Sequence, residues 1–236
     1  MNILEPNQTV RFITSIYNNS ELVRTGTIAD GSCLLHGILH ATSLKYRNGD
    51  IDKRKRIITE FRKTLADSVT RDQWLKLNGG CMARISFSIE YRRLIDQYYH
   101  EPNDIDKFVQ NVISKDIVEK VFEKYVNEKD IYMINSKITS TLLAYMKNKL
   151  NDVKNNSKVD ALLQKVEGTF NIMFQTAIEK ALLNYKQVLE DDRVWLGEEH
   201  IELISGIFGI TYIFLIVETD YHILLEKIIN IHMKKI

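Results

Sequence analysis

The residue best suited to chemistry is Cys33, which ends the segment Asp30-Gly31-Ser32-Cys33 and precedes a run of apolar residues. The run from Leu34 to Leu39 predicts a helix that begins at Cys33. The free N–H groups and the positive dipole end at the start of a helix favour a thiolate over a thiol. We therefore expect Cys33, rather than Cys81, to be the reactive one of the two cysteines.

The loop before Cys33 could also supply an oxyanion hole. Backbone N–H groups from Asp30 through Ser32 to Cys33 are predicted to point where a negative oxygen forms when a carbonyl is attacked. Gly31 would let the chain adopt a left-handed or otherwise crowded conformation there. The alternative is that Cys33 is a buried cysteine at a helix start and Asp30 only a cap. The tetrapeptide alone does not decide between them.

Two segments resemble ovarian-tumour (OTU) cysteine proteases. The first is Asp30-Gly31-Ser32-Cys33-Leu34-Leu35-His36, which is similar to the family signature of Asp-Gly-X-Cys-Leu, an aromatic or aliphatic residue, and often His or Arg. The second is Trp195-Leu196-Gly197 with the residues to Ile204 and the strand-like run Ile210 to Val217. It resembles the Trp-X-Gly element of the family, which opens a helix before a short strand.

The resemblance implies a deubiquitinase, a thiol hydrolase that cleaves the isopeptide bond to ubiquitin. Cys33 would attack the isopeptide carbonyl, a histidine would act as base and then acid, and loop N–H groups would hold the oxyanion. Asp30 corresponds to the loop Asp of the family, with a role in shaping the loop. Trp195 and Gly197 are expected to bind substrate, which is ubiquitin, polyubiquitin or a ubiquitin-like modifier. No cofactor and no metal are expected.

The general base is not identified by the sequence. The family places it on the last strand, usually before an aromatic residue, and the chain has no His-aromatic dipeptide. Three interpretations stay open: the chain ends before that histidine, His232 serves in a shortened ending, or the domain is a pseudo-enzyme. His222 is the alternative to His232. A third triad residue, an Asp or Asn just after the histidine, is likewise absent from any fitting position.

The remaining histidines are expected to be structural or exposed. His36 and His40 lie on the helix of Cys33, where neither can easily reach back to the thiol. Their spacing could bind zinc, but Gly37 replaces the glutamate of a zincin motif and no third ligand is evident. His100 is expected in a surface loop, and His200 in a packing position.

The pattern of apolar residues predicts mainly helices. Ile57, Ile58, Phe61, Leu65 and Val69 form one face of a helix from about Asp52 to Asp67. Further predicted elements are helices from Ile105 to Leu189 with a break at Asn151 to Lys158, a helix at Glu198 to Phe208, and a strand pair at Thr211 to Val217 and Tyr221 to Leu225.

For the fold class we expect α+β, like the OTU and related papain-like cysteine proteases. The prediction is a small, mainly antiparallel sheet built largely from the C-terminal third, with helices packed around it and an extra helical arm. The length suits one domain, 1–236, and the segment of about 104–190 is predicted to be a helical insertion.

The amino-acid composition limits the classes of partner and the cellular location that can be expected. The 32 basic and 31 acidic side chains give a net charge of +1, which offers no electrostatic reason to expect nucleic acid or a membrane as partner. Two cysteines and a polar opening predict a reducing, cytoplasmic location. The heavy use of Ile, Lys and Asn is typical of AT-rich genomes, such as those of large DNA viruses or intracellular bacteria, for which the location would be the host cytosol.

Two alternatives to the enzyme stay open. One is a non-catalytic module that keeps OTU architecture and binds ubiquitin or another partner but lacks a base. The other is a helical interaction domain unrelated to ubiquitin, which follows if both matching segments are coincidences. It predicts that alkylating reagents modify Cys33 no faster than Cys81.

Overall fold

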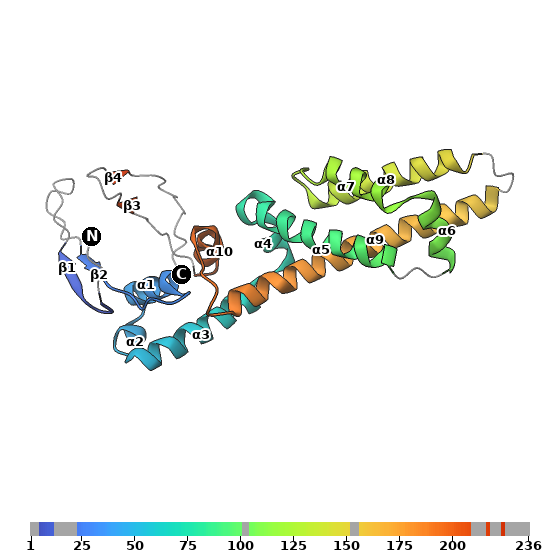
Figure 1. Cartoon of the computed structure of the whole chain (residues 1–236). Coiled ribbons are helices and arrows are strands. Elements are labelled where there is room, and N and C mark those ends of the chain that lie inside the picture. Colours follow the sequence, from blue (N-terminus) through green and yellow to red (C-terminus); the bar gives the residue numbers. More distant parts are fainter. Residues whose placement is uncertain are drawn as a thin grey trace. The chain divides into compact units, whose positions relative to one another are not determined.

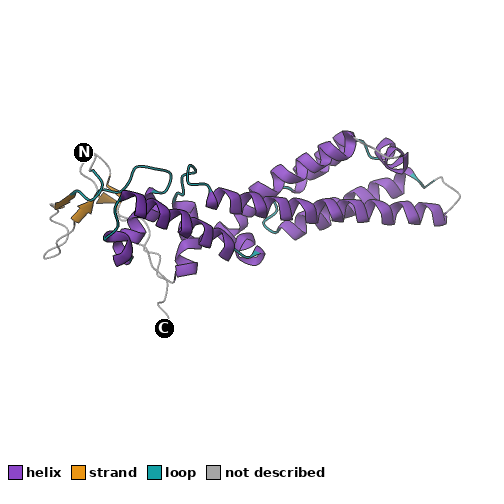
Figure 2. Ribbon diagram, turned by 90° about the horizontal axis from the view of Figure 1, so that it is seen from below, coloured by secondary structure: helices purple, strands orange, loops and turns teal. Residues whose placement is uncertain are grey.

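The computed structural model describes residues 5–11, 23–100, 104–151, 156–208, 216–217 and 223–224. Helices make up most of this part of the chain (Figure 1, Figure 2). The chain divides into two compact units. The first combines Met1–Val69 with Lys186–Ile236, and the second is Thr70–Tyr185. Most of the helical segment expected at about 104–190 therefore belongs to the second unit, which already begins at Thr70.

The first unit combines short strands with helices from both ends of the chain. Its elements are β1 (Thr9–Arg11), β2 (Val23–Thr25), α1 (Cys33–Thr42), α2 (Leu44–Arg47), α3 (Ile51–Ser68), the end of α9 (Asn156–Glu190), η2 (Glu198–His200), α10 (Ile201–Phe208), β3 (Ile216–Val217) and β4 (Ile223–Leu224). Strand β1 pairs antiparallel with β2, and β3 pairs antiparallel with β4.

Helix α3 is the helix against which the other helices of the first unit pack. It begins where the Asp50 carboxylate accepts a hydrogen bond from the Lys53 N–H, a standard N-cap. Its apolar face buries Ile58, Leu65 and Ala66, close to the face that the sequence spacing predicted. The helix packs against α1, α2 and α10. It is therefore positioned to support the loop that precedes Cys33.

The second unit is helical throughout its described part. Its elements are α4 (Arg71–Lys76), η1 (Leu77–Gly80), α5 (Cys81–His100), α6 (Asp104–Val112), α7 (Lys115–Tyr125), α8 (Ile131–Lys149) and most of α9. Aromatic rings fill its core: Phe87 meets Phe174 edge-on at 5.4 Å between centroids, and Tyr91 stacks on Phe122 at 5.3 Å. Such ring pairs stabilise the unit beyond what the burial of their apolar area contributes.

The predicted α+β fold with a mainly antiparallel sheet is wrong. Among the described residues, the strands form two separate two-stranded pairs, of three and two residues per strand, and the rest of the regular structure is helical. The sheet was expected from the resemblance, whereas the apolar spacing over most of the chain has the helical period. That local pattern determined the architecture.

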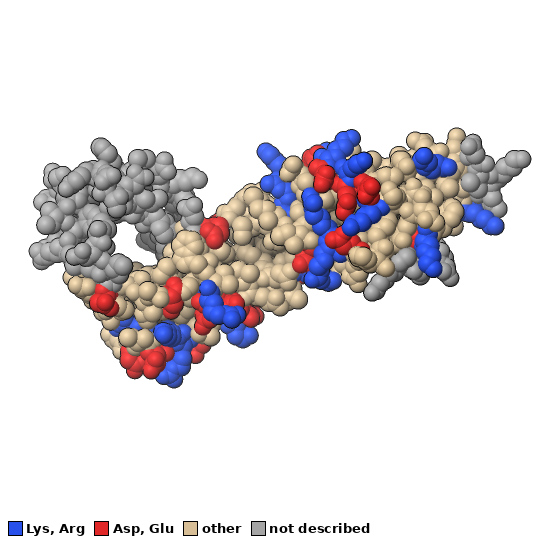
Figure 3. Space-filling view, viewed as in Figure 1, with Lys and Arg blue, Asp and Glu red and all other residues tan. Residues whose placement is uncertain are grey.

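Charges of both signs are interspersed on the face drawn in Figure 3, over the described residues. This distribution agrees with the net charge of +1. In the part of the chain that is described, no helix has the length and apolar character needed to cross a membrane.

Candidate active site around Cys33

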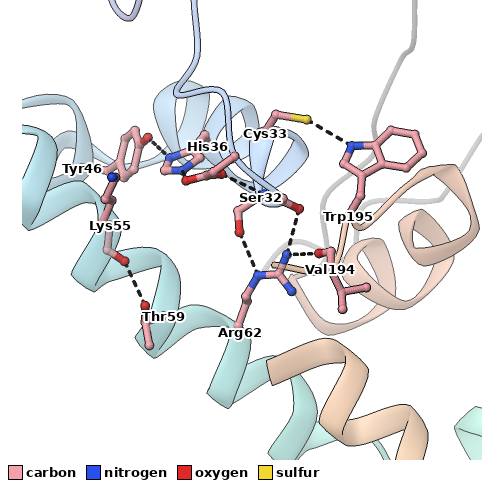
Figure 4. Close-up of polar contacts among 11 residues, drawn as sticks. Ser32, Cys33, His36, Tyr46, Lys55, Thr59, Arg62, Val194 and Trp195 are labelled. Atoms are coloured by element: carbon pink, nitrogen blue, oxygen red, sulfur yellow. Dashed lines mark hydrogen bonds and ion pairs between the residues drawn. The ribbon is translucent and has the colours of Figure 1, made fainter. Parts of the chain in front are cut away.

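Cys33 is the first residue of α1, and its side chain is half-buried. The N-cap of the helix is Ser32, which makes no side-chain hydrogen bond to the first turn. Its hydroxyl instead accepts a hydrogen bond from Arg62 Nε at 2.8 Å (Figure 4). The start of α1 therefore lacks the side-chain cap that usually satisfies the N–H groups there.

Arg62 holds the loop before Cys33 to the segment that follows α9. Its guanidinium is fully buried, and burial lowers its pKa, opposed by the charges of Asp192, Asp30 and Asp191. It donates five hydrogen bonds, to Ser32 Oγ (2.8 Å) and to the carbonyl oxygens of Gly31 (2.9 Å), Leu189 (3.1 Å), Asp191 (2.7 Å) and Val194 (2.7 Å). One side chain thus ties the loop before Cys33 to the residues that lead into the Trp195 segment.

Gly31 is required by a close backbone approach. A Cβ atom there would lie 2.5 Å from the Asp192 carbonyl oxygen and 3.0 Å from the Arg193 carbonyl carbon. Its carbonyl also accepts a hydrogen bond from the Leu196 N–H at 3.3 Å. Its φ is not in the left-handed region, so the crowded alternative, not the left-handed one, describes this glycine.

Trp195 lies against the candidate nucleophile. Its indole Nε1–H donates a hydrogen bond to Cys33 Sγ at 3.3 Å (Figure 4), while 63% of the residue remains exposed. A Cβ atom at Gly197 would lie 3.0 Å from Trp195 Cζ3 and 2.5 Å from Glu199 Oε2. The glycine therefore leaves room for the ring, and the two sequence segments meet at the sulfur.

Asp30 shapes the loop with both carboxylate oxygens. Oδ1 accepts a hydrogen bond from the Ser32 N–H at 2.8 Å, and Oδ2 lies 3.0 Å from His36 Nε2. The buried His36 ring uses Nδ1 to bond the Tyr46 hydroxyl. Burial raises the pKa of Tyr46, aided by Asp30 and opposed by Arg54, so the hydroxyl keeps its proton. His36 is thus a structural residue with both nitrogens engaged.

The predicted oxyanion donors are mostly used within the loop itself. The N–H of Asp30 donates to the Ile28 carbonyl at 3.1 Å, and the N–H of Cys33 to the Asp30 carbonyl at 3.3 Å. The N–H of Ser32 donates to the Asp30 carboxylate. These three amides are therefore satisfied before any substrate binds. Of the four predicted donors, Gly31 N–H has no partner among the described residues.

The structure does not identify the general base. His222 and His232 lie outside the described residues. His200 is buried at the end of η2, with Nδ1 3.1 Å from Glu199 Oε1, and burial lowers its pKa against the opposing charge of Glu199. His40 lies further along α1, and burial, with Arg54 and Arg47, lowers its pKa. His100 ends α5 in the second unit rather than lying in a loop.

The sequence interpretation missed Arg62. The signal was available: position 62 falls on the same helical face as Ile58 and Leu65, so an arginine interrupts a stripe of buried residues. A charged residue there needs several partners, because an unpaired buried charge is costly. The contact of the Trp195 indole with sulfur left no comparable signal, since it depends on the fold that joins distant segments.

No group of three or more His, Cys, Asp or Glu side chains is placed to bind a metal ion within the described ranges. Comparison with known proteins gives no assignment: the chain matches no family model, no curated protein and no solved structure.

Proposed function

We propose that the protein is a thiol hydrolase that cleaves the isopeptide bond at the carboxyl end of ubiquitin, with Cys33 as the nucleophile. The observation that carries the proposal is the hydrogen bond from Trp195 to Cys33 Sγ. It brings together two segments, far apart in the chain, that resemble OTU proteases on separate grounds. The reaction type is supported by this geometry and the substrate class by the resemblance.

The chemistry follows from a cysteine at a helix start that has no side-chain cap. The sulfur attacks the carbonyl carbon, and the π electron pair moves to the oxygen to form a tetrahedral intermediate. When that intermediate collapses, the amine leaves with a proton from a histidine acting as acid. Water then hydrolyses the thioester and releases the carboxylate of ubiquitin. The dipole of a helix stabilises negative charge at its N-terminus, which is where the sulfur lies.

A glycine-rich tail suits the surroundings of Cys33. The exposed Trp195 ring stands beside the sulfur, and the backbone of residues 192–193 closes in on Gly31. An extended chain without side chains can approach the sulfur past such a ring, whereas a bulky residue at the same place would collide with it. The tail of ubiquitin, which ends in glycines, has this property.

Hydrolysis of a fluorogenic amide attached to the carboxyl end of ubiquitin tests the proposal. Cys33→Ala should abolish turnover. His232→Ala or His222→Ala should lower kcat by about 10²- to 10⁴-fold for whichever histidine is the base. His100→Ala, an exposed histidine of the second unit, should leave the rate unchanged. A wild-type chain that binds the substrate but never cleaves it would refute the enzymatic proposal.

A second candidate is a non-catalytic ubiquitin-binding module. It is favoured by two contacts: the hydrogen-bond partner of Cys33 Sγ among the described residues is an indole, and His36 uses both nitrogens elsewhere. This candidate predicts saturable binding of ubiquitin in a calorimetric titration, with no turnover of any ubiquitin linkage. The fluorogenic assay therefore separates the two candidates.

A further inference from the structure

Of the four N–H groups in the loop before Cys33, that of Gly31 alone has no partner among the described residues. The other three, those of Asp30, Ser32 and Cys33, are already bonded within the loop. An oxyanion formed on a carbonyl attacked by Cys33 needs donors close to the sulfur, because its oxygen is only two bonds away from that atom. A donor that already contacts the sulfur is therefore well placed to act beside the Gly31 N–H.

Trp195 is such a donor. Its Nε1–H lies 3.3 Å from Cys33 Sγ, and an indole nitrogen can donate but not accept a hydrogen bond. The indole N–H can therefore bond only to an acceptor, and a negatively charged oxygen or sulfur is a strong one. This N–H contacts the Cys33 sulfur in the free protein and would lie beside the new oxyanion once the C–S bond has formed.

The backbone on both sides of Trp195 is tied to the nucleophile loop. The Val194 carbonyl accepts a hydrogen bond from Arg62 at 2.7 Å, and the Leu196 N–H donates to the Gly31 carbonyl at 3.3 Å. The residue itself stays 63% exposed. Trp195 thus combines an anchored backbone with a side chain free to shift by the short distance between sulfur and oxygen.

We propose that Trp195 is a catalytic residue whose indole N–H moves from the sulfur of Cys33 to the oxyanion of the tetrahedral intermediate. As the thiolate electron pair forms the C–S bond, the sulfur loses its charge and the carbonyl oxygen gains it. The hydrogen bond follows the charge, and no proton is transferred to or from the indole. For ubiquitin amides this role rests on the proposed function, but the same step occurs when Cys33 attacks any acyl carbon.

The variant Trp195→Phe keeps an aromatic ring and removes only the donor. Two small reagents separate the roles of that donor: p-nitrophenyl acetate acylates a thiolate through an oxyanion, whereas iodoacetamide alkylates it by direct displacement without one. Digestion of the reacted full chain and peptide mass analysis follow both reactions separately at Cys33 and at Cys81. Cys81, which is half-buried and has Arg84 as a neighbour at 3.8 Å, is the internal reference.

We expect Trp195→Phe to lower the ratio of acylation to alkylation at Cys33 at least about tenfold, and kcat on the ubiquitin amide about 10²-fold with KM little changed. The ratio at Cys81 should not move, and the thermal midpoint should stay within a few degrees. An unchanged ratio would overturn the proposal, whether both rates stay the same or both fall by the same factor. A wild-type chain that is acylated by the ester but inactive on ubiquitin would refute the ubiquitin substrate and leave the role of Trp195 decided by the ratio.

Discussion

Arg62 Nε donates a hydrogen bond to Ser32 Oγ at 2.8 Å, so the residue next to the candidate nucleophile is held by the buried face of α3. The same guanidinium binds carbonyl oxygens in the last turn of α9 and in the segment after it. The position of Trp195 relative to Cys33 therefore depends on a side chain that touches neither residue's reacting atoms.

Replacing Arg62 should destabilise the first unit and slow the reaction of Cys33. Arg62→Ala leaves five acceptors without their donor, and we expect it to lower the free energy of unfolding by about 3 kcal/mol or more. Arg62→Lys keeps the charge but has no planar fork, so its effect should be intermediate. Urea unfolding measures the change in stability, and the rate at which iodoacetamide alkylates Cys33 measures the change in reactivity.

Arg56→Ala is the matched control, because Arg56 lies on the exposed side of the same helix. It should change the free energy of unfolding by no more than about 0.5 kcal/mol. Equal losses in Arg56→Ala and Arg62→Ala would mean that the hydrogen bonds of Arg62 do not support the site.

Two glycine substitutions should change the stability of the protein in opposite directions. Gly31→Ala places a methyl group 2.5 Å from the Asp192 carbonyl oxygen, so the two segments must separate and both stability and Cys33 reactivity should fall. Gly37→Ala meets nothing closer than Thr27 Cγ2 at 3.9 Å, and it should stabilise α1 by about 0.5–1 kcal/mol. Thermal unfolding of both variants tests this pair, and a stabilised Gly31→Ala would contradict it.

How far the sequence could predict this molecule differs between the fold and the site. The apolar face of α3 and the start of α1 at Cys33 follow from local spacing, because helical periodicity is a short-range property. The expected sheet came from the resemblance and did not follow from such a pattern. The crowding at Gly31 and the bond between Trp195 and Cys33 depend on contacts between distant segments, which spacing alone cannot give.

His200 should make the first unit less stable in mild acid. Burial lowers its pKa below the ordinary 6.5, with Glu199 opposing and Arg62 adding to the shift. The unfolded chain therefore takes up a proton at a higher pH than the folded one. The stability that the neutral ring contributes is fully present above pH 6.5 and falls as the pH drops towards the lower folded-state pKa.

Urea midpoints measured above and below that pH test the prediction. His200→Gln should lose part of the pH dependence, whereas His100→Gln, at an exposed position, should keep all of it. His40→Gln measures the separate share of His40, whose pKa burial also lowers. The same dependence in wild type and His200→Gln would show that the buried ring does not contribute.

Covalent capture by ubiquitin carrying a C-terminal propargylamide shows directly whether Cys33 is the nucleophile. We expect a single adduct on the wild-type chain, mapped by peptide mass to Cys33, the same adduct on Cys81→Ala, and none on Cys33→Ala. A wild-type chain that forms no adduct, or one whose adduct maps to Cys81, would contradict the assignment of Cys33 as the nucleophile.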